Sequence, residues 1–64
     1  MELNKEKLVI AMARTGLNTT QLAEAYGVSR TRMNVILNSR RLTCACAGRL
    51  AKVLNCDVTE IIDN

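Results

Sequence analysis

The sequence has 64 residues, 48% of them hydrophobic, and a formal net charge of +3. A chain of this length forms one domain with a modest core, and its apolar content excludes a disordered polypeptide. The only aromatic residue is Tyr26, which excludes an aromatic stacking surface, and the longest apolar run, residues 8–13, is far shorter than the ~20 residues of a membrane-spanning helix.

The first half of the chain predicts two helices. Residues 4–14 form the first, which ends at Gly16, a residue that readily takes the left-handed conformation of a helix stop. The second begins at Asn18, because Asn18 and Gln21 have the spacing of a capping box, and it ends at Gly27.

Three more predicted helices follow, each opened by a side chain that can cap a first turn. They run from Ser29 to Asn38, from Thr43 to Leu54 and from Asp57 to Ile62. Asn55 can take the left-handed conformation that ends the fourth helix. Asp57 and Glu60 have the spacing of a second capping box, so the last helix is expected to be a turn or two long.

Apolar residues recur at helical spacing on one side of each longer predicted helix. They define the expected core: Leu8, Ala11, Met12, Leu22, Ala23, Tyr26, Met33, Ile36, Leu37, Ala47, Leu50, Ala51 and Leu54. No internal repeat, linker or strand-like alternation interrupts this pattern. We therefore predict an all-α fold, a compact five-helix bundle that forms a single domain over residues 1–64.

The charges are distributed unevenly along the chain. Every charged residue between Glu24 and Asp57 is basic: Arg30, Arg32, Arg40, Arg41, Arg49 and Lys52. A solvated surface usually mixes both signs, so this segment indicates a polyanionic partner.

The third predicted helix has an unusual outer side. Opposite its apolar residues lie Thr31, Asn34, Val35 and Asn38, flanked by Arg30 and Arg32. Asn can bond adenine through N6 and N7, Arg can bond guanine through O6 and N7, and a Val or Thr methyl can pack on the thymine methyl. These are base edges of the major groove of double-stranded DNA.

Two arginines in a first helical turn are unfavourable in the free protein. The positive end of the helix dipole disfavours each cation by roughly 0.3–1 kcal/mol. When a polyanion approaches that end, the dipole, the backbone N–H groups and both guanidinium groups attract it together. Arg30 and Arg32 therefore suit a DNA-binding helix.

Groups suited to phosphate lie on both sides of this helix in the sequence. Thr19 and Thr20, at the start of the second helix, are neutral donors beside free backbone N–H groups. Arg40 and Arg41 follow the end of the third helix and can reach the backbone across the groove. Contacts of this kind position a protein on DNA, whereas base contacts specify the sequence.

The stretch LNTTQLAEAYGVSRTRMNVILNSRR, residues 17–41, resembles the helix-turn-helix of the lambda-repressor-like superfamily, the Cro/XRE type of regulator. The stretch LAKVLNCDVTEII, residues 50–62, is similar to that family's fourth and fifth helices. The resemblance implies a helix-turn-helix at about residues 18–38, with the third helix in the major groove. It also implies homodimers on palindromic operators, with half-sites ~34 Å apart.

The resemblance also implies roles for single residues. It assigns base contacts to Arg30, Thr31, Arg32, Asn34 and Val35. It places Thr19, Asn38 and Arg40 at phosphate-contacting positions, to which the donor and charge pattern adds Thr20 and Arg41. Two positions depart from the family: Met12 and Leu37 stand where an ion pair is common, and Thr19 replaces a longer Gln. An apolar pair preserves the fold, but one phosphate contact is lost and another is shortened.

These features predict a sequence-specific DNA-binding transcriptional regulator of phage or mobile-element type, repressor-like or Cro-like. The alternative is a protein-interaction module, such as an antitoxin-like partner or a helix-turn-helix that no longer binds DNA. Val9 and Ile10 favour it slightly, because they cannot both face the same core as Leu8 and Met12. We expect Val9 and Ile10 to be ordinary core residues, with a homodimer seam as the other possibility.

The sequence offers no catalytic or metal-binding motif. It has no His, no glycine-rich phosphate loop and no paired carboxylates among apolar residues, so we expect no enzyme, no cofactor and no small-molecule ligand. Cys44 and Cys46 point about 200° apart on one helix, and Cys56 lies a helix length further on, so we expect small core thiols rather than a metal site. With no signal peptide and no membrane partner, we expect a cytoplasmic protein.

Overall fold

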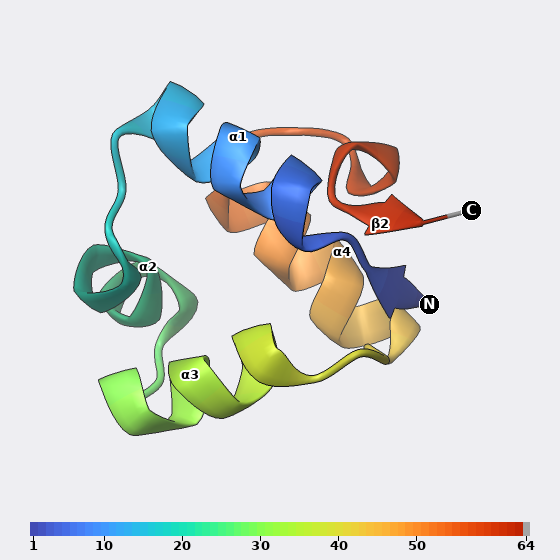
Figure 1. Ribbon diagram of the computed structural model, residues 1–64. Helices are drawn as coiled ribbons and strands as arrows, with labels where there is room; N and C mark the ends of the chain where they lie inside the picture. The colour runs from blue at the N-terminus through green and yellow to red at the C-terminus, as the bar shows by residue number, and fades with distance from the viewer. Residues whose placement is uncertain (64) are drawn as a thin grey trace.

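The computed structural model describes residues 1–63, so Asn64, the last residue of the predicted domain, lies outside the described residues. In chain order the elements are β1 (Glu2–Leu3), α1 (Lys5–Thr15), α2 (Thr19–Tyr26), α3 (Arg30–Asn38), α4 (Cys44–Val53), the 3-10 helix η1 (Val58–Glu60) and β2 (Ile62–Asp63). Figure 1 shows the α-helices arranged around one centre, with β1 and β2 side by side at one edge. The predicted all-α class is therefore confirmed, with a small sheet added to it.

The predicted boundaries of α1 and α2 are confirmed to within one residue. Gly16 and Gly27 end the two helices with φ of 73° and 92°, in the left-handed region that favours glycine. The capping box of α2 forms: Asn18 Oδ1 accepts the Gln21 N–H at 2.8 Å, and Gln21 Oε1 accepts the Asn18 N–H at 3.0 Å. Asn4 caps α1 by accepting the Lys7 N–H at 3.0 Å.

The predicted caps of α3 and α4 are confirmed as well. Ser29 Oγ accepts the Arg32 N–H at 3.1 Å, and Thr43 Oγ1 accepts the Cys46 N–H at 3.1 Å. Asn55 takes φ of 52° just after α4, as expected for a helix stop. These side chains place the start of α3 immediately after the turn that ends α2.

The predicted count of five helices is not confirmed, and two short strands occur that the sequence analysis did not predict. The segment after Asp57 is a single 3-10 turn, although Glu60 Oε2 accepts the Asp57 N–H at 3.0 Å as a capping box would. β1 and β2 pair antiparallel, with Leu3 opposite Ile62, and Glu2 also forms a bridge to Arg41. Strands of two residues are too short for an alternating pattern to be visible in the sequence.

The core confirms most of the predicted apolar set. The buried residues are Leu3, Leu8, Ala11, Leu22, Ala23, Tyr26, Met33, Ile36, Leu42, Ala47, Leu50, Ala51, Leu54, Ile61 and Ile62. Met12 and Leu37, predicted to be inward, are half-buried and pack against this core. An apolar pair thus occupies the positions where the resemblance implies an ion pair.

Two expectations about apolar side chains are corrected. Val9 and Ile10 are not core residues, because 63% and 54% of their surfaces are exposed. Cys44 is exposed, whereas Cys46 and Cys56 are half-buried against the core. Val9, Ile10 and Cys44 lie on helix sides that no other element among residues 1–63 covers completely. Every helix among those residues is also too short or too polar to cross a bilayer.

Candidate nucleic-acid interface

The turn between α2 and α3 is held from behind by α4. Arg49 on α4 donates from Nη2 to the carbonyl oxygen of Tyr26 at 2.6 Å, and its guanidinium carbon lies 4.5 Å from the centre of the Tyr26 ring. The cation satisfies a carbonyl at the negative end of α2 and stacks on the aromatic face. Arg49, counted above among the basic residues, is exposed but has its guanidinium group bound to Tyr26.

A hydrogen bond from Tyr26 and the close approach of Arg49 to Gly27 also tie this turn to α4. The Tyr26 hydroxyl donates to Cys46 Sγ at 3.3 Å. This hydrogen bond is the main cause that raises the pKa of Tyr26, and burial of the side chain is the second. A Cβ at Gly27 would meet Nη2 of Arg49 at 3.3 Å, in addition to the strain of its positive φ. The geometry between α2 and α3 is thus fixed by contacts to α4.

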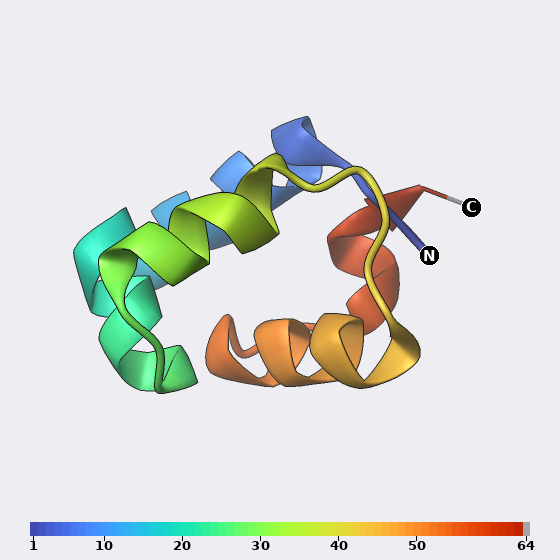
Figure 2. The same cartoon turned by 90° about the horizontal axis from the view of Figure 1, so that it is seen from below.

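The predicted base-contacting residues share one exposed side of α3. Met33 and Ile36 are buried on the opposite side of the helix. The exposed residues are Arg30, Thr31, Arg32, Asn34, Val35 and Asn38. In Figure 2, which views the molecule from below, α3 runs across the front of the molecule. An α-helix of nine residues is about 13 Å long, which a major groove can accommodate.

The N-terminal end of α3 joins several groups that attract anions. Ser29 caps only the Arg32 N–H, and the other N–H groups of a first turn have no acceptor within the helix. The exposed side chains of Arg30 and Arg32 belong to the same turn. No acidic residue lies in the first turn of α3.

The threonines predicted to contact phosphate lie at the N-terminal end of α2. Thr20 is exposed and Thr19 is half-buried. Asn18 and Gln21 exchange two hydrogen bonds between their side chains and backbone N–H groups. The N–H groups of the residues between them have no acceptor within the helix. Figure 1 shows α2 leading into α3 through a short turn, so the helix that begins with these threonines is the direct neighbour of α3.

The loop that follows α3 is held by the N-terminal strand. The Leu3 N–H donates to the Arg40 carbonyl oxygen at 3.0 Å, and Arg41 is bridged to Glu2. The side chains of Arg40 and Arg41 remain exposed. The backbone of the loop is therefore fixed, while its two guanidinium groups stay free to reach outward.

Lys5 is a candidate contact that the sequence analysis missed. Its Nζ donates to Oδ1 of Asn38 at 3.2 Å, which places an exposed ammonium group at the C-terminal end of α3. Lys5 and Asn38 are 33 positions apart in the chain. No local pattern marks this pair, because it depends on how β1 and α1 pack beside the loop after α3.

A shallow groove of about 220 Å³ connects the two predicted kinds of contact. Arg32 and Val35 from α3 line it together with Arg41 from the following loop. Residues predicted to contact bases therefore border the same depression as a residue predicted to contact phosphate.

Among residues 1–63, no three His, Cys, Asp or Glu side chains gather where they could hold a metal ion. Burial raises the pKa of the Cys56 thiol, which disfavours the thiolate that would bind a metal. The three cysteines are free thiols.

Comparison with known proteins links this geometry to a family. The model of the Cro/C1-type HTH DNA-binding domain matches residues 7–63. The matched range includes α2, α3, the loop after α3 and all of the predicted base and phosphate contacts, whereas Lys5 precedes it. Searches among curated proteins and among solved structures found no match.

Proposed function

The chain belongs to the Cro/C1-type HTH DNA-binding domain family, and from this premise we propose that it is a sequence-specific transcriptional regulator that binds double-stranded DNA. One observation carries the proposal: the exposed side of α3 combines polar and cationic side chains, and no acidic residue occurs between Glu24 and Asp57. A face of this kind is electrostatically and chemically matched to the major groove.

We assign the base contacts to α3. Asn34 would bond adenine, and the methyl groups of Thr31 and Val35 would pack on the thymine methyl. Arg30 and Arg32 flank these central positions and suit either a guanine edge or a nearby phosphate. The pattern of the three central residues would set the preferred sequence.

We assign the phosphate contacts to two groups on either side of α3. Thr19 and Thr20 form the first, at the N-terminal end of α2. Asn38, Arg40 and Arg41 form the second, to which the hydrogen bond from Lys5 to Asn38 adds a further cation. Because these groups flank the base-contacting helix, they would fix its depth and register in the groove.

We also propose the biological setting that goes with such a domain. The protein would bind a palindromic operator as a homodimer, at least on DNA, with half-sites ~34 Å apart. It would act as a repressor or Cro-like switch of a phage or mobile element in the cytoplasm. The protein would act by binding DNA. It would catalyse no reaction and would need neither a cofactor nor a small-molecule ligand.

Selection of bound sites from random double-stranded DNA tests this function. We expect enrichment of one short sequence arranged as an inverted repeat. Enrichment without a repeat would contradict the palindromic operator, and no enrichment at any salt concentration would contradict sequence-specific binding itself. Since phosphate contacts dominate affinity and weaken with salt, the selection should be run near 50 mM as well as near 200 mM salt.

A protein-interaction module is the second candidate function. The exposure of Val9 and Ile10 favours it, because two large aliphatic side chains on one helix are suited to a protein contact. A gel shift without DNA binding, together with a stable complex with a purified partner protein, would favour this function over DNA binding.

A further inference from the structure

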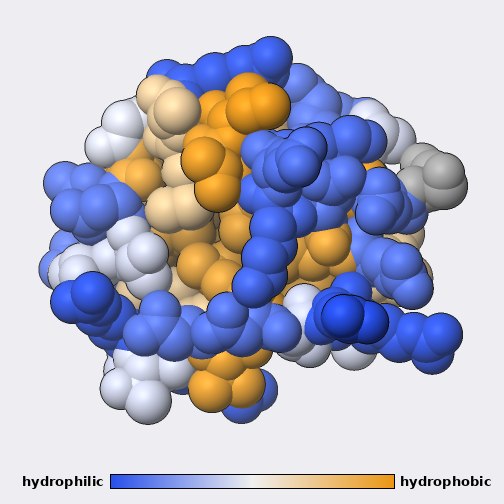
Figure 3. All heavy atoms as spheres, viewed as in Figure 1, coloured by the Kyte–Doolittle hydropathy of each residue, from blue (hydrophilic) through white to orange (hydrophobic). Residues whose placement is uncertain are grey.

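The outward side of α1 is a second exposed surface with its own chemistry. We call it the α1 outer face, and it consists of Glu6, Val9, Ile10, Ala13 and Arg14, all of which are exposed. Figure 3 shows hydrophobic atoms reaching the surface over α1, among hydrophilic neighbours. Met1, Val9, Ile10 and Val35 are the large hydrophobic residues that the described part of the chain exposes most, so two of them belong to this face.

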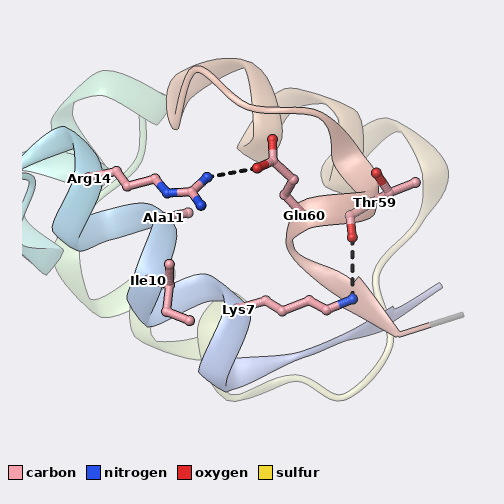
Figure 4. Close-up of a pocket in the computed structure, with 6 residues that line it drawn as sticks. All are labelled: Lys7, Ile10, Ala11, Arg14, Thr59 and Glu60. Atoms are coloured by element: carbon pink, nitrogen blue, oxygen red, sulfur yellow. Dashed lines mark hydrogen bonds and ion pairs between the residues drawn. The ribbon is translucent and has the colours of Figure 1, made fainter.

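A groove of about 330 Å³ runs along one edge of the α1 outer face, between α1 and η1. Figure 4 shows Ile10 at its opening, between the side chains of Lys7 and Arg14. Arg14 Nη1 lies 2.8 Å from Glu60 Oε1, and Lys7 Nζ donates to the carbonyl oxygen of Ile62 at 3.1 Å. Both cations are thus tied to the C-terminal segment, and the apolar side chain between them is left uncovered.

The charges along the α1 outer face are ordered so that the face complements itself. Glu6, Ile10 and Arg14 lie at positions i, i+4 and i+8, on one stripe of the helix. A negative charge therefore lies at one end, an aliphatic side chain in the middle and a positive charge at the other end. When the same stripe of a second copy packs antiparallel to it, Glu6 of each copy lies beside Arg14 of the other copy.

We propose that the α1 outer face binds a second copy of the same chain, with the two α1 helices antiparallel and centred on Ile10. The contact is isologous: Ile10 packs on the partner's Ile10, and Glu6 of each copy pairs with the partner's Arg14. The bond between Arg14 and Glu60 does not compete with this pairing, because a guanidinium has five N–H donors.

The size of this surface limits its strength. Helix α1 has 11 residues and is about 16 Å long, so one face of it buries much less than the ~800 Å² per partner of a standard stable interface. The dimer is therefore weak. Local concentration on DNA, where several copies lie close together, favours it.

The α1 outer face shares no residue with the groups assigned to DNA. Helices α1 and α3 meet at one end, where Lys5 Nζ donates to Asn38 Oδ1 at 3.2 Å, but neither residue belongs to the α1 outer face. The contact between two copies does not rest on the proposed function, and it can be tested separately from DNA binding.

Two matched substitutions separate the contact from DNA binding. Ile10 and Val35 are each 54% exposed, the first on α1 and the second on α3. Sedimentation velocity of the DNA-free protein from about 5 to 500 µM follows association, and a gel shift on a single selected site follows DNA binding. We expect Ile10→Glu to weaken association at least about tenfold and to leave single-site binding unchanged, and Val35→Glu to do the reverse.

Charge reversal tests the antiparallel pairing itself. Glu6→Arg alone and Arg14→Glu alone bring like charges together, and each should weaken association about threefold to tenfold. The double variant carrying Glu6→Arg and Arg14→Glu should restore it, since the stripe is then complementary again. Far-UV circular dichroism of each variant checks that α1 stays folded.

Three results would overturn the proposal. A wild-type protein that stays monomeric up to 500 µM would remove the dimer, and Ile10→Glu with unchanged association would place it on another surface. A double charge reversal that is no better than the single variants would refute the antiparallel pairing. Failure of DNA binding in the same preparations would count against the proposed function only, because association is measured without DNA.

Discussion

The outer faces of α1 and α3 each expose an aliphatic side chain to the same extent, but the charged residues beside that side chain differ. Ile10 and Val35 are each 54% exposed. Val35 lies among polar and cationic residues in a segment without any acid, whereas Ile10 lies between Glu6 and Arg14, one charge of each sign. An exposed aliphatic residue alone therefore does not identify a partner. The charges beside it do, since a face of one sign suits a polyanion and a face of mixed sign suits another protein.

The largest effect is expected from removing the support beneath α3. Met33 is fully buried behind the exposed side of this helix. Met33→Ala should lower the free energy of unfolding by about 2–5 kcal/mol, because it leaves a cavity in a small core. Ile10→Ala is the matched change on α1 and should stay within about 0.5 kcal/mol. Urea unfolding of both variants measures the difference, and equal losses would contradict the assignment of Ile10 to the surface.

A smaller effect, confined to sequence preference, should follow changes on the exposed side of α3. Arg30→Ala and Thr31→Ala should each lose about 1–3 kcal/mol of discrimination at one base pair of the selected site. Competition binding with single-base variants of the site measures it. Losses of equal size on every DNA sequence would show that α3 does not recognise bases.

Changes in the loop after α3 should act on all DNA sequences alike. Arg40→Ala should weaken binding uniformly and lower the slope of log affinity against log salt by about one, because one phosphate contact is lost. Lys5→Ala should reduce the slope by a similar amount if the ammonium beside Asn38 reaches a phosphate. Lys52→Ala, on α4, is the control, and we expect it to change the slope less than either variant.

The smallest effect is expected on the pH dependence of stability, through Glu60, which pairs with Arg14 on α1. Two hydrogen bonds hold the pKa of the Glu60 carboxyl below its ordinary value. The larger effect comes from the Asp57 N–H and the smaller one from the Arg14 guanidinium. A lowered folded-state pKa stabilises the protein above the ordinary glutamate pKa of about 4.3, and this contribution is lost as the pH falls through the lower folded-state value. Glu60→Gln should therefore flatten the dependence of stability on pH below about 4.5. Unfolding at pH 3 to 7 checks this, and an unchanged slope would argue against a charged Glu60 in the cap.

The helix boundaries could be predicted because their signals are local. Gly27 must take a positive φ and Ser29 must cap the next turn, so the two residues mark the joint between α2 and α3 in the sequence itself. The exposed side of α3 follows from the same logic, because Met33 and Ile36 fix its buried side. Periodicity and caps therefore carry the fold and the outline of the candidate interface.

The remaining features depend on contacts between distant segments. The sequence shows Arg49 only as a basic residue, and its bond to the Tyr26 carbonyl depends on how α4 packs. The position of Lys5 beside Asn38 depends on the pairing of β1 with the loop after α3. The helical pattern shows that Val9 and Ile10 point away from Leu8. Whether another element covers them depends on where η1 packs, which the sequence does not show. Tertiary placement, not propensity, decides each of these cases.

Backbone amide chemical shifts during titration with the selected DNA site test the account most directly. The central claim is that the exposed side of α3 is the DNA-binding face. The account predicts the largest shift changes at Arg30–Asn38, with further changes at Thr19, Thr20, Arg40 and Arg41, and little change along Val9–Arg14. The largest changes along α1, with α3 unaffected, would contradict it.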